Sequence, residues 1–339
     1  MRSEFCVIGL VAFIAGGARA EDRTALVWPT PNEAFAQNKP LEAILQHAGS
    51  GDPESGGFGC VRSNGTQFHE GIDIKAVNRD RRGEPTDDIY AAMDGVVSYI
   101  NGRAGESSYG RYIVLEHPAQ TPAVYTLYAH LSSVAPNLKV GDHVARGSVM
   151  ATMGHTAGGY AIPRERAHLH FEMGLWITRN FQAWYTGRKF GSPNEHGLYN
   201  GMNLMGFDPL DFMRQLRAHT VNNFQEYISR MDETVRVRIA TSRTPDFMQR
   251  YPSLRTKEPP MLVAGWEVKF NWTGLPIAFT PLAFTEVAGL ASEKPEVVYV
   301  NAEIERQHRC KSLAVARRGG GWTIGRDLEI VLEQLFGVK

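Results

Sequence analysis

The chain has 339 residues, of which 43% are hydrophobic, and it carries 36 basic and 36 acidic side chains. This length suits about two domains and the apolar content suffices for a sizeable core. A formal net charge of zero argues against a dedicated nucleic-acid binder, which needs a basic face to neutralise phosphates, although it leaves room for a local basic patch.

The first twenty residues have the pattern of a secretory signal peptide. Arg2 precedes an apolar run at residues 5–15, and small residues follow up to Ala18-Arg19-Ala20, after which cleavage is expected. The apolar run is shorter than the about 20 residues of a membrane span, which disfavours a membrane anchor. We therefore expect an exported protein of the cell envelope, periplasmic or extracellular, without a stable membrane span.

Export would determine whether the cysteines can form a disulfide. Cys60 and Cys310 remain after removal of residues 1–20. In an oxidising compartment they could form one disulfide between the N-terminal half and the tail, or they could be two unrelated buried thiols. Sequence alone does not give the connectivity.

The segment at residues 21–54 precedes the main β-rich region. It holds an expected entry strand at 26–29 and a short helical run at 40–48, and residues 49–59 are rich in Gly, Pro, Ser and Asp, which predicts a loop.

From residue 68 onward, short alternating runs bounded by Gly, Pro and Asn predict an antiparallel sheet or barrel-like fold. The expected strands are residues 71–75, 89–92, 95–100, 111–116, 124–130 and 168–173, with a tight turn between short strands at 140–147.

Two stretches look inserted into this β-rich region. Residues 77–88 are charged and predict a solvated loop. Residues 179–206 are long, aromatic and rich in Gly and Asn, and the aromatics argue against disorder. This aromatic insert could form one wall of a groove, a local core, or both.

The remainder predicts a second, smaller domain. A helix beginning at Asp208 closes the first domain, and the polar residues 219–225 suggest a linker. Strands near 235–241, 262–272 and 297–301 and a final amphipathic helix at 327–336 predict a small α+β domain. The expected organisation is a signal peptide at 1–20, an N-terminal segment at 21–54, a mainly β domain at 55–218 with the insert 179–206, and a C-terminal α+β domain at 226–339.

Two short strings carry the clearest chemistry. They are His69-Glu-Gly-Ile-Asp73 and His168-Leu-His170. Because a strand places residues i, i+2 and i+4 on one face, His168 and His170 should share a face, and so should His69 and Asp73, with Gly71 leaving room for a metal. Three nitrogen and oxygen ligands with an open position are typical of a catalytic zinc.

Together with other short motifs, these strings resemble the lysostaphin-like zinc metallopeptidases, a family of secreted peptidoglycan endopeptidases. The resemblance covers about residues 55–178 and implies a mainly β, lysostaphin-type catalytic fold. The matching motifs are His69-x-Gly-x-Asp73, Tyr90-Ala-Ala-x-Asp-Gly-Val-Val, Tyr109-Gly110, Tyr125-Thr-x-Tyr-Ala-His130-Leu131, Val140-Gly-Asp-x-Val, Gly147, Gly154-x-Thr156 and His168-Leu-His-Phe-Glu172.

The resemblance also implies roles for individual residues. His69, Asp73 and His170 would be the zinc ligands, with water or the substrate carbonyl in the fourth place. His130 and His168 would be the catalytic pair. One would act as general base on the water and the other would stabilise the oxyanion or protonate the leaving amine, and these roles could be exchanged.

Other candidate residues have simpler interpretations. Glu70 is expected at the surface, because no second histidine follows at position 73 and Gly71 disfavours a helix. Tyr109 resembles a groove-lining aromatic of the family, or is a packed strand-end tyrosine. Four further histidines are expected to be structural or at the surface: His117, His143, His155 and His196.

The favoured function is a secreted zinc endopeptidase that cuts peptide cross-links of peptidoglycan. Family members divide between glycyl bridges and D-amino-acid cross-links, and we favour the latter. A non-catalytic cell-wall binding or hydrolase-regulating module on the same scaffold is the alternative, although such relatives typically lose metal ligands. A phosphocarrier-type barrel is disfavoured by the signal peptide and by Asp73. The C-terminal domain could bind the wall, bind a partner, or occlude the groove.

Overall fold

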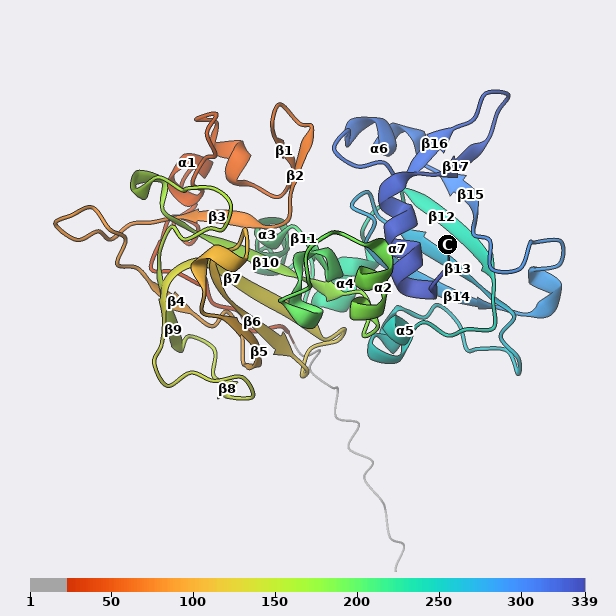
Figure 1. The fold of residues 1–339 in the computed structure, drawn as a ribbon, viewed down its shortest axis with the longest axis horizontal. Coiled ribbons are helices and arrows are strands. Elements are labelled where there is room, and N and C mark those ends of the chain that lie inside the picture. Colours follow the sequence, from red (N-terminus) through yellow and green to blue (C-terminus); the bar gives the residue numbers. More distant parts are fainter. Residues whose placement is uncertain (1–22, 339) are drawn as a thin grey trace, which may run out of the picture.

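The computed structural model describes residues 23–338, and its two larger antiparallel sheets lie side by side with helices packed between them (Figure 1). The predicted signal peptide at residues 1–20 lies outside the described residues. Within 23–338, every helix is too short or too polar to cross a membrane.

The larger sheet holds nine strands within the described residues. Its main path runs β11-β10-β7-β6-β5-β8, β3 lies beside β10, and β9 links β7 to β4. This confirms the predicted antiparallel sheet, and the path does not close into a barrel. The strands are β3 (Ile72–Lys75), β4 (Asp88–Tyr90), β5 (Gly95–Asn101), β6 (Arg111–His117), β7 (Val124–Val134), β8 (His143–Val144), β9 (Val149–Met153), β10 (His168–Trp176) and β11 (Leu204–Phe207).

Strand β10 shows how the sequence builds the sheet. Leu169 and Phe171 are fully buried in the main hydrophobic core, together with every second residue that follows. His168 and His170 alternate with them and therefore point to the opposite face. Burial of each large apolar side chain stabilises the fold by about 1.5–3 kcal/mol, so the register that keeps the apolar face inward also fixes the histidines on the other face.

The smaller sheet belongs to the C-terminal part of the chain. Its strand order is β14-β13-β12-β15, and helix α7 packs near it, as the α+β prediction expects (Figure 1). Its strands are β12 (Val235–Ala240), β13 (Gly265–Phe270), β14 (Pro276–Leu282) and β15 (Glu296–Val300), and β16 (Ala314–Ala316) and β17 (Trp322–Ile324) form a hairpin. The helices of the chain are α1 (Leu41–Ile44), α2 (Phe181–Arg188), α3 (Pro209–Arg217), α4 (Phe224–Ser229), α5 (Asp246–Arg250), α6 (Ala302–Gln307) and α7 (Arg326–Phe336).

Helix α3 begins as predicted. The Asp208 side chain accepts hydrogen bonds from the backbone N–H groups of Leu210 and Asp211, and Pro209 occupies the first turn. Both features favour a helix start, because the cap satisfies donors that the helix leaves free and proline needs no donor there.

Two predicted elements are wrong. Residues 26–29 form no strand, and only isolated backbone hydrogen bonds, such as Val27 N–H to the carbonyl of Ala92, connect them to the sheet. Residues 219–225 are not a polar linker, because Val221 and Phe224 are fully buried and Phe224 stacks on Phe212 with ring centroids 4.3 Å apart. Proline at positions 29 and 31 interrupts the first segment, and the two apolar side chains anchor the second.

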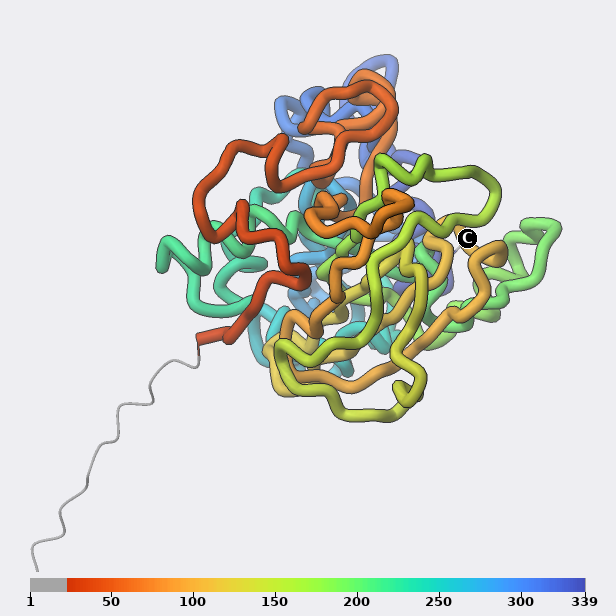
Figure 2. Tube along the Cα trace, turned by 90° about the vertical axis from the view of Figure 1, so that its left-hand side faces the viewer, coloured from red at the N-terminus to blue at the C-terminus, as the bar shows by residue number. Residues whose placement is uncertain are grey.

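Cys60 and Cys310 form a disulfide across 250 residues of sequence. Cys60 lies on β1 (Gly59–Arg62), which forms a hairpin with β2 (Gln67–His69), so the bond ties this hairpin to the C-terminal part. Figures 1 and 2 show the two segments side by side at the same end of the molecule. The alternative of two unrelated thiols is excluded.

His117 on β6 has a structural role, one of the two that the sequence left open for it, and it is fully buried. Its Nδ1–H donates to the carbonyl of Asp94 at 2.8 Å, and Nε2 pairs with the hydroxyl of Thr126 at 2.8 Å. Burial lowers the pKa of His117 to about 4.

This pKa predicts a loss of stability in mild acid. Because the folded state holds the pKa of His117 below the unfolded value of about 6.5, its contribution is complete above pH 6.5 and is lost as the pH falls towards 4. The difference corresponds to about 3 kcal/mol. We expect the free energy of unfolding in urea to fall by that much more in the wild type than in His117→Gln between pH 7 and pH 4. Parallel pH dependences of the two proteins would contradict this role.

Candidate metal centre

Three strands bring the two motifs together. His69 ends β2, the chain bends at Glu70-Gly71, and Asp73 lies on β3. Strand β3 then pairs with β10 in a register that sets Asp73 directly opposite His170. The prediction from strand alternation placed His69 and Asp73 on one continuous strand, whereas they lie on two strands. Their side chains still converge because the bend redirects the chain.

The space left by Gly71 has a different use from the one predicted. A Cβ atom at this position would lie 2.3 Å from the carbonyl oxygen of Phe171. Glycine thus allows the bend to pass against the backbone of β10, which is what brings β3 into register, rather than making room for a metal.

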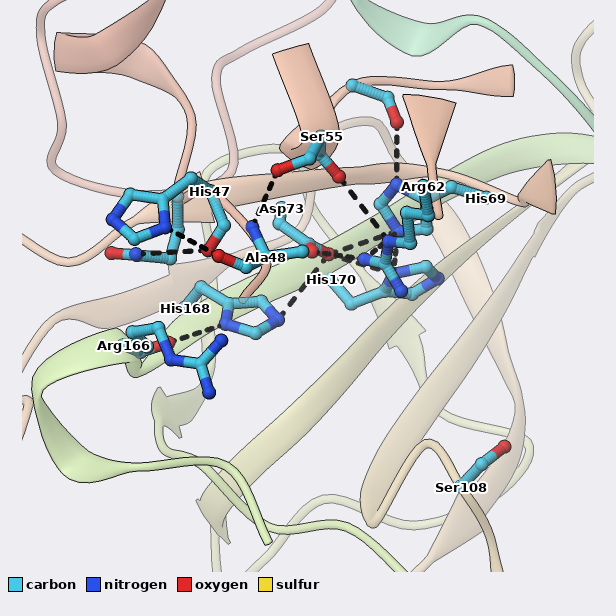
Figure 3. Close-up of polar contacts among 12 residues, drawn as sticks. His47, Ala48, Ser55, Arg62, His69, Asp73, Ser108, Arg166, His168 and His170 are labelled. Atoms are coloured by element: carbon cyan, nitrogen blue, oxygen red, sulfur yellow. Dashed lines mark hydrogen bonds and ion pairs between the residues drawn. The ribbon is translucent and has the colours of Figure 1, made fainter. Parts of the chain in front are cut away.

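The candidate ligand atoms form a compact triangle (Figure 3). His69 Nε2 lies 3.0 Å from His170 Nδ1 and 3.2 Å from Asp73 Oδ1, and His170 Nδ1 lies 3.1 Å from Asp73 Oδ1. Tetrahedral ligands at zinc bond lengths of 2.0–2.1 Å are about 3.3 Å apart, so these edges fit zinc. All three side chains are buried, and two imidazoles with one carboxylate are the donor set of catalytic zinc sites.

The second nitrogen of each candidate ligand histidine is held by a hydrogen bond. His69 Nδ1–H donates to the carbonyl of Gly57 at 2.6 Å, and His170 Nε2–H donates to Glu172 Oε1 at 2.9 Å. These bonds hold the outer nitrogen of each ring and direct His69 Nε2 and His170 Nδ1 at the centre, as outer partners of metal-binding histidines do.

The charges around the triangle favour an ionised carboxylate. Burial alone would raise the pKa of Asp73, but the neighbouring His168 and His69 and the hydrogen bonds from His170 and His69 hold it well below its usual range. Burial alone would lower the pKa of His170, but its hydrogen bonds to Asp73 and Glu172 outweigh burial and raise it to about 9. The site therefore concentrates negative charge on a buried oxygen pair that a cation can neutralise.

The predicted catalytic pair lies beside this triangle. His168 Nε2 is 3.4 Å from Asp73 Oδ1, and the ring centroids of His130 and His168 are 4.9 Å apart. His168 Nδ1–H donates to the carbonyl of Arg166 at 2.7 Å and His130 Nδ1–H donates to that of Thr156 at 2.8 Å. The Nε2 atom of each neutral ring therefore carries a free lone pair.

Burial lowers the pKa of both histidines of the pair. Interaction with the neighbouring His168 and His170 in their charged forms lowers the pKa of His130 further, whereas Asp73 opposes the effect of burial on the pKa of His168. Both rings are thus neutral at neutral pH and available as proton acceptors.

His130 reaches the site through an unusual backbone conformation. Its φ is +62°, in the left-handed region that a non-glycine residue rarely adopts. By alternation along β7 its side chain would follow Tyr128 into the main core, whereas the ring of His130 lies 5.8 Å from that of His170 on the opposite face. Such conformations cost about 1–3 kcal/mol and cluster at functional sites.

Two residues of the centre were missed by the sequence analysis. Glu172 is 1% exposed, and besides His170 it accepts the hydroxyl of Tyr125 at 2.8 Å. Strand parity could have found it, because position 172 shares a face with 168 and 170. Arg62 donates from Nη2 to Asp73 Oδ2 at 2.5 Å and to His69 Nε2 at 2.9 Å. No local pattern signals this contact, which depends on the β1–β2 hairpin.

The aromatic insert forms a wall of a cavity of about 760 Å³ next to the centre. Tyr185, His196 and Met202 of the insert line it, together with Glu70 and Tyr109. The insert also has its own core, since the rings of Phe181, Trp184, Tyr185 and Phe190 are in contact. Both predicted roles of the insert are therefore compatible in one structure.

The secondary candidates are placed as follows. Glu70 is exposed, as predicted. Tyr109 lines the cavity and also packs against Tyr112, with ring centroids 5.3 Å apart, so both interpretations of Tyr109 are compatible with the structure. His143 is exposed, and His155 pairs with Glu84 at 3.1 Å. His196 is half-buried rather than free at the surface, and it bonds Tyr99 and the carbonyl of Glu106.

Comparison with known proteins identifies the class of this region. The model of Peptidase family M23 matches residues 67–181, about a third of the chain, so this region is similar to that peptidase family. This confirms the resemblance to the lysostaphin-like peptidases that the motifs suggest. Comparison with curated proteins found no match.

Several solved structures are similar over part of the chain. A Ruminococcus gnavus protein that carries the name of a glycyl-glycine endopeptidase, LytM, is 28% identical over 32% of this chain, with a TM-score of 0.25, and the match spans 39% of that protein. The catalytic domain of lysostaphin from Staphylococcus simulans is 21% identical over 47% of this chain and 87% of its own length (TM-score 0.28). The catalytic domain of the prophage-encoded M23 protein EnpA from Enterococcus faecalis is 20% identical over 39% of this chain and 87% of its own length (TM-score 0.27).

The buried Glu172 generates a prediction about metal affinity. Replacement by glutamine removes the negative charge that holds His170 Nε2–H, and loss of such outer partners weakens metal binding by about 10–100-fold. We expect Glu172→Gln to lower zinc affinity by about tenfold or more, measured by competition with a chromogenic chelator. Tyr125→Phe, which removes only the other hydrogen bond of Glu172, is the control and should change affinity less. Equal affinities of wild type and Glu172→Gln would show that Glu172 has no such role.

Proposed function

We propose that this protein is an exported, zinc-dependent endopeptidase that hydrolyses peptide cross-links of bacterial peptidoglycan. The observation that carries the proposal is the convergence of two imidazole nitrogens and one carboxylate oxygen beside two further imidazoles with free lone pairs. His69, Asp73 and His170 would hold the metal. A zinc ion held there would polarise the scissile carbonyl and acidify the attacking water.

The proton transfers are assigned to the histidine pair. His168 is the better base, because its Nε2 lies 3.4 Å from the candidate ligand atom Asp73 Oδ1 and is fixed in the acceptor tautomer by the carbonyl of Arg166. As the oxygen of water adds to the carbonyl carbon, His168 takes its proton. When the C–N bond breaks, the same proton passes to the leaving amine.

His130 would act on the charge that develops on the carbonyl oxygen. Its Nδ1–H is committed to Thr156, so Nε2 becomes a donor only when the ring takes up a proton. Burial favours the neutral ring, so His130 would take up a proton only as negative charge develops on the carbonyl oxygen, and the left-handed backbone at His130 holds the ring on the correct face. Exchange of the two roles keeps the same overall balance of protons.

The rest of the chain is given supporting roles in this proposal. Residues 55–218 would be the catalytic unit, with the aromatic insert forming one wall of the substrate groove, and residues 226–339 an accessory unit. The similarity to Peptidase family M23 supports peptidoglycan as the substrate, and the expected signal peptide supports export. D-amino-acid cross-links are the favoured bond class.

Two substitutions separate metal binding from chemistry. His170→Ala should lose both stoichiometric zinc and hydrolysis, whereas His168→Ala should keep zinc and lose about 10²–10⁴-fold in turnover, the usual contribution of a general base. Zinc is measured by elemental analysis and hydrolysis by mass spectrometry of fragments released from sacculi. Retained hydrolysis in His170→Ala would refute the site, and a metal-free protein that still binds sacculi would favour the non-catalytic wall-binding alternative.

A further inference from the structure

Arg62 contacts two of the three candidate metal ligands. Its Nη2 donates to Asp73 Oδ2 at 2.5 Å and to His69 Nε2 at 2.9 Å, and its guanidinium lies among the ligand side chains (Figure 3). The Arg62 side chain is 26% exposed and that of Asp73 is 3% exposed, so this ion pair is only partly screened by solvent.

The contact with His69 cannot coexist with a metal on the same nitrogen. His69 Nδ1 carries the ring hydrogen, because it donates to the carbonyl of Gly57. Nε2 therefore has one lone pair, which either accepts the N–H of Arg62 or binds a cation. The guanidinium also brings a permanent positive charge to the position that a dication would approach. Arg62 and the metal therefore compete for His69 Nε2, and Arg62 also pairs with the second carboxylate oxygen of Asp73.

The β1–β2 hairpin that carries Arg62 is held by the C-terminal part of the chain. Cys60, two residues before Arg62, forms the disulfide with Cys310. Trp272 packs edge-on against Phe58 and Phe68, with ring centroids 5.9 Å apart in each pair. These contacts extend on both sides of the hairpin and restrict its movement.

Two further contacts tighten this junction. Lys311 Nζ lies 3.9 Å from the ring centroid of Phe68, a cation–π contact with the strand that leads to His69. Gly59 has φ +105°, and a Cβ atom there would lie 2.9 Å from Trp272, so the hairpin approaches the tryptophan as closely as its backbone allows. The hairpin is thus clamped at its base by residues more than 200 positions away in sequence.

We propose that Arg62 is a built-in competitor for the metal, and that the C-terminal part keeps it on the ligands through the disulfide-bonded hairpin. The proposal rests on the proposed function only in taking His69, Asp73 and His170 as the metal ligands. Metal loading then requires Arg62 to leave His69, and freeing the hairpin from Cys310 makes that departure easier. The role of the C-terminal part in this account is to set the metal affinity of a site that it does not itself build.

The test measures zinc affinity in the chain without residues 1–20 by competition with a chromogenic chelator. Arg62→Ala should bind zinc at least about tenfold more tightly than the wild type, because hydrogen bonds to charged groups contribute about 1.5–3 kcal/mol and 1.4 kcal/mol is tenfold. Arg166→Ala is the matched control, since it removes a nearby positive charge whose side chain makes no hydrogen bond or ion pair with the ligands among the described contacts. Its affinity should change less than twofold, a minor effect of charge alone.

The role of the clamp is tested by Cys60→Ser combined with Cys310→Ser. This double variant should bind zinc more tightly than the wild type but should add nothing to Arg62→Ala, because both changes relieve the same competition. If the double variant does not fold, Arg62→Ala and Arg166→Ala still decide whether Arg62 competes. Equal affinities of wild type and Arg62→Ala would overturn the inference and leave the metal site intact, whereas no zinc binding by any variant would overturn the proposed function as well. Full additivity would show that the clamp acts independently of Arg62.

Discussion

The centre depends on the pairing of β3 with β10, which sets Asp73 opposite His170 and holds their side chains 3.1 Å apart. A buried carboxylate is costly unless it is paired, and here its partners are imidazoles that are themselves buried. A slip of one residue would turn the ligands into the apolar core and the core side chains onto the site. Burial of the hydrophobic face of β10 therefore fixes the register that positions the candidate ligands on its polar face.

A second constraint acts through backbone carbonyls. The carbonyls of Gly57, Arg166 and Thr156 each accept the Nδ1–H of one histidine, and Glu172 holds the fourth ring. One nitrogen of each ring is thereby held by an outer acceptor, and the other nitrogen is directed into the site. Four histidines in the same volume without these acceptors could rotate or exchange tautomers, so the surrounding loops matter as much as the rings.

Local patterns in the sequence predict much of the fold and part of the site. Alternation along β10 predicts that His168 and His170 share a face, and the structure confirms it. Alternation along β7 would place the side chain of His130 in the core, because it does not anticipate the left-handed backbone conformation that turns this side chain to the other face. Only the resemblance to a family assigns His130 to the site. The sequence does not predict the contact of Arg62 with the candidate ligands. This contact depends on a hairpin that is held by a disulfide between cysteines 250 residues apart in sequence. Non-local constraints of this kind leave no trace in a short window of sequence.

The central claim is that two histidines and one aspartate form a metal centre. X-ray absorption spectroscopy of the zinc-loaded protein tests it most directly, because the zinc edge reports the ligand atoms and their distances. The account predicts a first shell of nitrogen and oxygen atoms alone at about 2.0–2.1 Å with the outer-shell scattering of two imidazoles, reduced to one in His170→Ala if zinc is retained at all. Sulfur ligands, or a spectrum without imidazole scattering, would contradict it.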